Sequence, residues 1–159
     1  MSLKDQLNAD LRDAMRAGEE IRKATLRLLI TAIRNAEIPP EGATGAGARI
    51  ELDDDAVLGV LRREVTQRRD SIEAYDKAGH GDLVAREDAE LTILAAYLPA
   101  QMSREEIEVT TREIIQRIGA SGPADKGKVM SAIMAELRDK ADGREINTVV
   151  TDLLAGAAS

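Results

Sequence analysis

Apolar residues recur at helical spacing along almost the whole chain, and no segment shows the alternating pattern of a half-buried strand. The sequence contains no Phe and no Trp, and its two tyrosines are Tyr75 and Tyr97, so aromatic side chains contribute little to the core. Hydrophobic residues still make up 43% of the 159 residues, enough for a core of Leu, Ile, Val, Ala and Met. Such a core suits packed helices, and we predict an all-α fold.

The chain begins with two predicted helices. The first runs from Leu3 to Met15, and Gly18 is expected to end it. The second covers about positions 20–37, where apolar residues occupy about half of the helix circumference. That breadth predicts a central helix with neighbours on two sides.

A loop and two more helices follow. Positions 38–52 contain two prolines and three glycines, which predicts a mobile loop. Positions 53–78 read as one helix of about 39 Å. Glycines at 79 and 81 break the pattern, and Asp82 is expected to cap the fourth helix.

Pro99 is the predicted boundary between a helical N-terminal domain, residues 1–98, and a smaller C-terminal domain, residues 99–159. After it, the segment from Ser103 to Glu106 matches a capping box, in which serine and glutamate each bond one free backbone amide. Two further apolar patterns follow, the last starting near Gly143. We therefore predict three short helices in the second domain.

Charge and composition limit the possible functions. The formal net charge is -7, which argues against a general nucleic-acid coat protein but permits local basic patches. Cysteine is absent, so disulfides and thiolate chemistry are excluded. The N-terminus lacks the apolar run of a secretion signal, and no apolar run reaches the roughly 18 residues needed to span a bilayer. We expect a cytosolic protein with no membrane contact.

The stretch GPADKGKV, residues 122–129, resembles a phosphate-binding loop. Such a loop requires a preceding strand, and a Ser or Thr after its lysine to bind magnesium. Here the preceding residues are helical in pattern, Val129 follows Lys128, and Pro123 removes one amide. We predict a helix start and no nucleotide cofactor, with Gly127 tolerated because another helix passes close by.

Basic residues form the candidate binding surface. On the second predicted helix, three of them fall within about 40° of each other. Further arginines follow Leu61, and lysines flank the start of the helix near Gly127. A solvated or salt-bridged face is the alternative for each group. The candidate nucleic-acid-binding residues are Lys23, Arg27, Arg34, Arg62, Arg63, Arg69, Lys126, Lys128, Lys140 and Arg144.

Other polar residues do not suggest a reaction. Arg68 falls within the apolar stripe and is expected to pair with a carboxylate or extend to solvent. His80 is the only histidine, and the acidic run at 53–55 lacks the spacing of a calcium loop. Helix capping explains those acids adequately. We predict no metal and no catalytic residue.

Three segments resemble the YqeY family. They are SLKDQLNADLRDAMRAG, then REVTQRRDSIEAYDKAGHGDLVAREDAELTILAAYLPAQMS, and finally ADKGKVMSAIMAEL with KADGREINTVV. The YqeY family is similar to the tail of GatB, a subunit of the glutamine-dependent amidotransferase that converts misacylated Glu-tRNA or Asp-tRNA. Gly127, Met130 and the helix starting near Gly143 match a G-x-x-M segment and helix of that tail.

The resemblance implies an all-α fold and a module that contacts tRNA, or a tRNA-charging or amidotransferase assembly. It also carries an inherited label, carbon-nitrogen ligase with glutamine as amido donor. The catalytic domain and glutaminase partner that perform this chemistry do not fit in 159 residues. We therefore expect no activity from the chain alone.

Three alternatives remain from the sequence. The broad apolar face of the second helix and the long third helix could dock a partner protein, without any nucleic-acid role. The second alternative is that the chain is an accessory enzyme of the amidotransferase. The third is a DNA-reading helix-turn-helix around Asp139–Gly143, whose last helix is poorly basic at its start.

Overall fold

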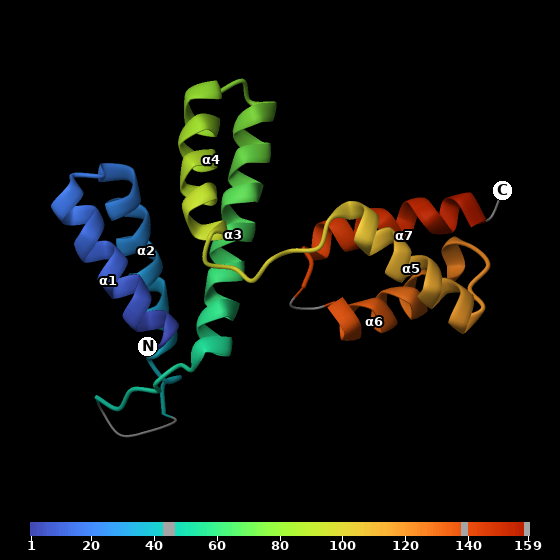
Figure 1. Ribbon diagram of the computed structural model, residues 1–159, viewed down its shortest axis with the longest axis horizontal. Helices are drawn as coiled ribbons and strands as arrows, with labels where there is room; N and C mark the ends of the chain where they lie inside the picture. Colours follow the sequence, from blue (N-terminus) through green and yellow to red (C-terminus); the bar gives the residue numbers. More distant parts are fainter. Residues whose placement is uncertain (43–46, 138–139, 158–159) are drawn as a thin grey trace. The chain divides into compact units, whose positions relative to one another are not determined.

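A computed structural model describes residues 1–42, 47–137 and 140–157 (Figure 1). These residues form seven α-helices, one 3-10 turn and no strand, which confirms the all-α prediction. The elements are α1 (Leu3–Ala17), α2 (Glu20–Ala36), α3 (Asp54–Lys77), α4 (Gly81–Ala95), α5 (Arg104–Ile118), η1 (Pro123–Asp125), α6 (Lys126–Leu137) and α7 (Gly143–Ala157). No helix in the described ranges is both long and apolar enough to cross a bilayer.

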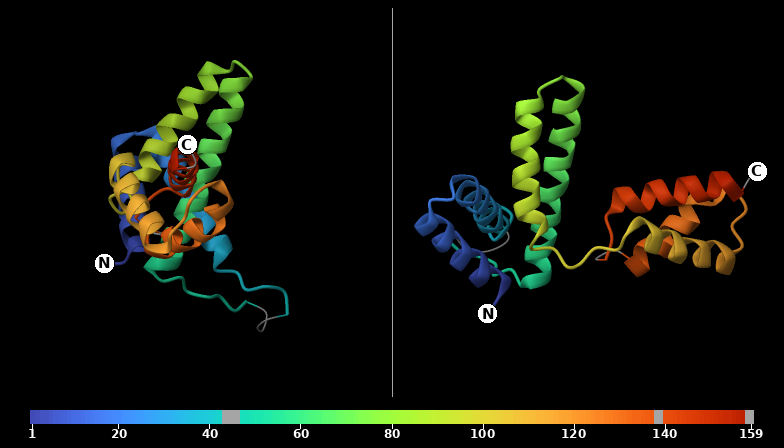
Figure 2. Two further views of the ribbon diagram at one scale, coloured as in Figure 1. Left: turned by 90° about the vertical axis from the view of Figure 1, so that its right-hand side faces the viewer. Right: turned by 45° about the horizontal axis from the view of Figure 1, so that its top comes forward.

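The chain divides into two compact units, Met1–Leu98 and Pro99–Ser159. In the first unit, α1 and α2 form one helical hairpin, and α3 and α4 form a second, longer one (Figures 1 and 2). Helix α2 contacts the three other helices of the unit, in agreement with its predicted central position. The first core consists of Leu7, Leu26, Leu29, Ile30, Ile33, Val57, Val60, Leu61, Val65 and Leu94.

The apolar surface of α2 is wider than the core that covers it. Ile21 and Leu28 are 51% and 53% exposed, and Leu28 lines the edge of a hollow formed with α3 and α4. They lie seven residues apart, so both occupy one side of α2. The unit thus leaves part of an apolar helix face open to solvent.

Helices α5, α6 and α7 pack around the second core. The amide of Met102, just before α5, donates to the carbonyl of Lys140, just before α7, at 2.8 Å. This bond joins the starts of two helices that lie far apart in sequence. The core residues are Ile107, Ile114, Val129, Ile133, Leu137, Ala141, Ile146, Val149, Val150 and Leu154.

The helix ends follow local rules in part. The predicted capping box of α5 is confirmed, because Ser103 accepts from the Glu106 amide at 3.2 Å while Glu106 accepts from the Ser103 amide at 2.7 Å. The prediction for α4 is wrong. Its N-cap is His80, which provides no side-chain bond, and Asp82 already lies inside the first turn. There its carboxylate can only favour the helix through the dipole.

The explanation given for Gly127 is also wrong. A Cβ built at this position meets no atom within 4 Å, so no passing helix requires a glycine here. Gly18 is different, since it ends α1 with a φ of 70°, in the left-handed region that favours glycine.

The predicted loop between α2 and α3 contains no helix in the residues described, and positions 43–46 lie outside them. The end of this loop that leads into α3 is hydrogen-bonded to the end of α2. The amide of Ile50 donates to the Glu37 carbonyl at 2.8 Å, and the amide of Leu52 donates to the Glu37 carboxylate at 3.4 Å. Glu37 therefore holds the start and the end of the loop together.

Candidate nucleic-acid interface

The basic stripe of α2 forms because its members are spaced by four and seven residues, which places them on one helix face. Lys23 is half-buried and pairs with Glu20 at 2.6 Å. Arg27 is exposed, and its guanidinium lies 3.8 Å from the Met15 sulfur. Arg34 is also exposed, and neither arginine forms an ion pair within the described part of the chain. Two of the three stripe residues are thus available to a phosphate.

The arginines of α3 are less available. Arg62 and Arg69 are half-buried and already interact with other groups. Arg63 is exposed and shares with Arg62 a shallow hollow of about 300 Å³ on the helix surface. Of these three, Arg63 is the exposed cation for which the described residues provide no ion pair.

Arg68 pairs with carboxylates, which was one of the two alternatives predicted for it. It is 7% exposed and lies 2.7 Å from the carboxylate of Glu64 and 3.5 Å from that of Glu90 on α4. Its Nε atom is buried and has no hydrogen-bond partner among the described residues. Glu73, which also lies on α3 near these arginines, pairs with Lys77 at 2.9 Å.

The candidate residues of the second unit lie around α6 and α7. Lys126 is half-buried, whereas Lys128, Lys140 and Arg144 are exposed. Arg144 already interacts with another group. Lys128 and Lys140 are therefore the most accessible cations of this set. Asp139, in the proposed helix-turn-helix, lies outside the described residues.

The segment that mimics a phosphate loop follows a helix, α5, rather than a strand. Its turn is closed by its own acid, because Asp125 accepts a hydrogen bond from the Ser121 amide at 2.9 Å. That bond, aided by the charge of Lys128, lowers the pKa of Asp125. A carboxylate thus occupies the turn where a phosphate loop would present free amides.

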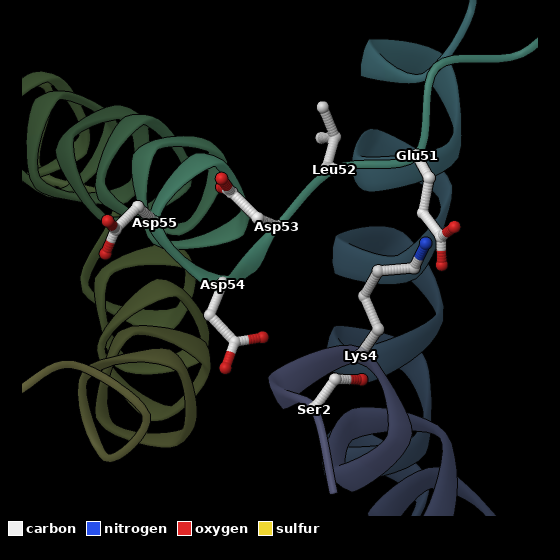
Figure 3. A pocket seen from close by; sticks show the side chains of 7 residues that line it. All are labelled: Ser2, Lys4, Glu51, Leu52, Asp53, Asp54 and Asp55. Carbon is white, nitrogen blue, oxygen red and sulfur yellow. The ribbon is translucent and has the colours of Figure 1, made fainter.

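An open hollow of about 660 Å³ lies between the start of α1 and the start of α3. Figure 3 shows the carboxylates of Asp53, Asp54 and Asp55 pointing in different directions. Asp53 accepts from the Ala56 amide, and Asp54 accepts from the Leu3 amide, both at 2.9 Å. These acids therefore act at helix starts, as predicted, and the described residues contain no group of three or more acids or histidines arranged to hold a metal.

A smaller pocket of about 200 Å³ brings together cations from three parts of the first unit. Lys4 comes from α1, Arg34 from α2 and Arg49 from the end of the loop. Arg34 was a sequence candidate, whereas Lys4 and Arg49 were missed. No sequence signal links these two residues to Arg34, because Lys4 lies 30 positions before it and Arg49 lies 15 positions after it.

A comparison with protein families matches residues 4–154 to the family YqeY, described as Yqey-like protein. The chain belongs to this family. The resemblance stated from the sequence segments is thereby confirmed.

Relatives of this Yqey-like chain include fungal proteins named "Altered inheritance of mitochondria protein 41, mitochondrial". The one from Lachancea thermotolerans is 35% identical over 74% of this chain and 60% of its own length. That from Kluyveromyces lactis is 32% identical over 74% of this chain and 61% of its own length. The chain spans about 60% of the length of these curated relatives.

These names correct the expected location. A cytosolic protein was inferred from the lack of a secretion signal and of a membrane-spanning run, whereas the relatives are named as mitochondrial proteins. The prediction of a cytosolic location is therefore wrong. The two features used for it concern secretion and membrane insertion, and neither distinguishes between compartments inside a cell.

Proposed function

We propose that this Yqey-like chain is a non-catalytic module that binds tRNA through exposed cations, in the manner of an accessory to a tRNA-dependent amidotransferase or charging assembly. The observation that carries the proposal is that Arg27 and Arg34 are exposed on one face of α2 and form no ion pair with any described residue. The similarity of the family to the GatB tail supports tRNA as the nucleic acid.

The physical basis of binding is local charge. Arginine side chains that contact phosphates release counterions, and this effect positions a nucleic acid without reading its sequence. The net charge of -7 opposes the approach of RNA to most of the surface. Binding is therefore restricted to the cationic faces, weak and strongly dependent on salt.

The test is direct binding of total tRNA to the full chain at low salt. We expect a dissociation constant of about 1 to 100 µM, which weakens steeply as salt is added. Arg27→Glu/Arg34→Glu should weaken binding more than Arg12→Glu/Arg16→Glu, a matched pair of exposed arginines on α1. A wild-type chain that leaves tRNA unbound at about 100 µM contradicts the proposal.

The inherited ligase label is tested separately. We propose that the chain supplies binding and that glutamine-dependent amide formation on Glu-tRNA requires other subunits. The chain alone should give no amidated product. Turnover by the purified chain, lost on heat denaturation, would show instead that it is an enzyme.

A protein–protein adaptor is the second candidate, and the exposed Ile21 and Leu28 favour it. Apolar residues on one open helix face are the usual contacts of a partner helix. A partner retained after ribonuclease treatment, and lost in Ile21→Ser/Leu28→Ser, would support an adaptor. Loss of all partners after ribonuclease treatment would support RNA binding.

A further inference from the structure

The pocket of Lys4, Arg34 and Arg49 has an apolar floor and a cationic rim. Leu7, Ile30 and Ile33 line it and belong to the buried core, with exposed fractions of 0%, 7% and 2%. Lys4 is half-buried, whereas Arg34 and Arg49 are exposed, so the two guanidinium groups lie at the mouth of the pocket above this apolar floor. Salt can therefore screen their charges.

The pocket carries an excess of positive charge. Lys4 contacts the carboxylate of Glu37, whose residue is 6% exposed, and these two charges offset each other. Arg34 forms no ion pair within the residues described, and Arg49 makes no hydrogen bond there, although its charge also acts on the Glu37 carboxylate. Three cations thus share one carboxylate. Asn8, the remaining polar lining residue, donates its side-chain amide to the Lys4 carbonyl at 2.8 Å. Two guanidinium charges are thus left over.

The chain holds these two arginines near each other without a ligand. The loop end that bears Arg49 is attached to α2 by the bond from Ile50 to the Glu37 carbonyl, 2.8 Å long. Arg34 lies three residues before Glu37, one helical turn away on α2. A site assembled in advance loses less conformational entropy when an anion binds.

The size of the pocket selects the kind of ligand. Sites for whole small molecules typically enclose about 300 to 1,000 Å³, whereas this one encloses about 200 Å³. It can take one anionic group and not a complete nucleotide. The planar guanidinium fork matches the oxygens of a phosphate and can bond two of them at once.

We propose that this pocket seats one backbone phosphate of a bound RNA, held by Arg34 and Arg49 beside the Lys4–Glu37 pair. The proposal rests on the proposed function, since it names one contact of the tRNA. A macromolecular phosphate is favoured over a small free one because Arg27 lies two turns along the same face of α2. A single small anion would use the pocket alone, whereas an RNA strand can contact both positions.

The test compares two double variants of the full chain in tRNA binding. Arg34→Gln/Arg49→Gln removes the two pocket charges, and Arg12→Gln/Arg16→Gln removes the same charge from exposed positions on α1. We expect the pocket variant to bind total tRNA about tenfold more weakly at low salt, the loss of roughly one charge-assisted phosphate contact. Its salt dependence, as the slope of log affinity against log salt, should fall by about 1. The control should change affinity less than twofold.

The outcomes separate the two proposals. If wild-type binds tRNA and both variants weaken it equally, the phosphate seat is wrong and the proposed function stands. If wild-type does not bind tRNA, both are wrong. An NMR titration with inorganic phosphate, compared with chloride at equal ionic strength, tests whether the pocket binds a free small anion instead of RNA. Shifts at Asn8, Arg34 and Arg49 without any tRNA binding would assign the pocket to a free small anion and overturn the RNA assignment.

Discussion

The hydroxyl of Tyr97 donates a hydrogen bond of 2.6 Å to the carboxylate of Asp10, across 87 positions of sequence. Tyr97 follows the end of α4, and Asp10 lies within α1. Arg22, near the start of α2, lies 4.0 Å from the same carboxylate. Two helices of the first unit and the turn after α4 therefore meet at one polar contact beside the core.

This contact predicts the ionisation of Tyr97. Burial, followed by the hydrogen bond to Asp10, raises the pKa of Tyr97 from 10.0 to about 12. In Tyr75→Phe, Tyr97 is the only tyrosine, so its absorbance reports this group alone. We expect tyrosinate to appear near pH 12 while circular dichroism still shows helix. A midpoint near pH 10 in the helical protein would contradict the contact.

The same shift has a consequence for stability. A raised pKa in the folded state means that the neutral phenol is favoured there. The contribution of Tyr97 to the free energy of unfolding is therefore complete below pH 10, the pKa of tyrosine in the unfolded chain. It is lost as the pH rises towards about 12, the pKa in the folded chain. Tyr97→Phe should remove this alkaline loss, while it lowers the free energy of unfolding at neutral pH by about 1 to 2 kcal/mol.

Glu37 provides the second prediction, because it joins α1, α2 and the loop end. The hydrogen bond from Lys4, aided by that from the Leu52 amide, lowers the pKa of Glu37. We expect Glu37→Gln to lower the free energy of unfolding by about 1 to 2 kcal/mol at pH 7, measured by urea denaturation. Glu41→Gln, an exposed change in the same loop, should have almost no effect.

The acid dependence of Glu37 follows from the sign of its shift. A lowered pKa contributes stability above the ordinary value of 4.5, and this is lost as pH falls through the folded value. The difference in stability between wild type and Glu37→Gln should therefore shrink below about pH 4. A constant difference from pH 7 to pH 3 would show that packing, and not the charge, is responsible.

How far the sequence determines this structure can be judged from single residues. Ser103 and Glu106 were predicted correctly, because a capping box depends only on residues three positions apart. For Arg68 the sequence left two alternatives, extension to solvent or pairing with a carboxylate, and the structure shows the second. The partner Glu90 on α4 was not identified, since helical periodicity says nothing about which helix lies opposite.

The failure to find the pocket has the same physical origin. The spacing of Arg27 and Arg34 places them on one face of one helix, but the pocket also requires Lys4 and Arg49 from other segments. Only the chain's path around Glu37 brings them together. For His80 and Asp82 the error was local, because both can start a helix and the backbone selected the earlier position. Helix ends vary by one or two residues for this reason.

The third prediction concerns the buried pair of Arg68 and Glu90. Arg68→Met leaves Glu90, whose side chain is 11% exposed, with Arg86 at 3.5 Å as its one ion-pair partner among the described residues. We expect a loss of about 2 to 4 kcal/mol in the free energy of unfolding, because an incompletely paired buried carboxylate is costly. The double variant Arg68→Met/Glu90→Gln should recover part of it. A double variant as unstable as the sum of both single changes would show that the pair does not interact.

The last prediction compares two kinds of contact in the second unit. Arg104 pairs with Glu108 at 3.1 Å on its own helix, and with Glu145 at 3.4 Å and Asp152 at 2.8 Å on α7. Its side chain is 40% exposed, so water and salt screen these three pairs. Ile146, by contrast, is 0% exposed between the same helices.

The magnitudes therefore favour the apolar contact. We expect Arg104→Met to lower the free energy of unfolding much less than a core truncation does, and less still in high salt. Ile146→Ala should cost about 2 to 5 kcal/mol and respond little to salt, because it leaves a cavity in a close-packed core. Urea denaturation at low and high salt, with amide exchange of α7 to assign the loss to this unit, measures both. If Arg104→Met proved the more damaging of the two, the ion pairs would hold α5 and α7 together more than the core does.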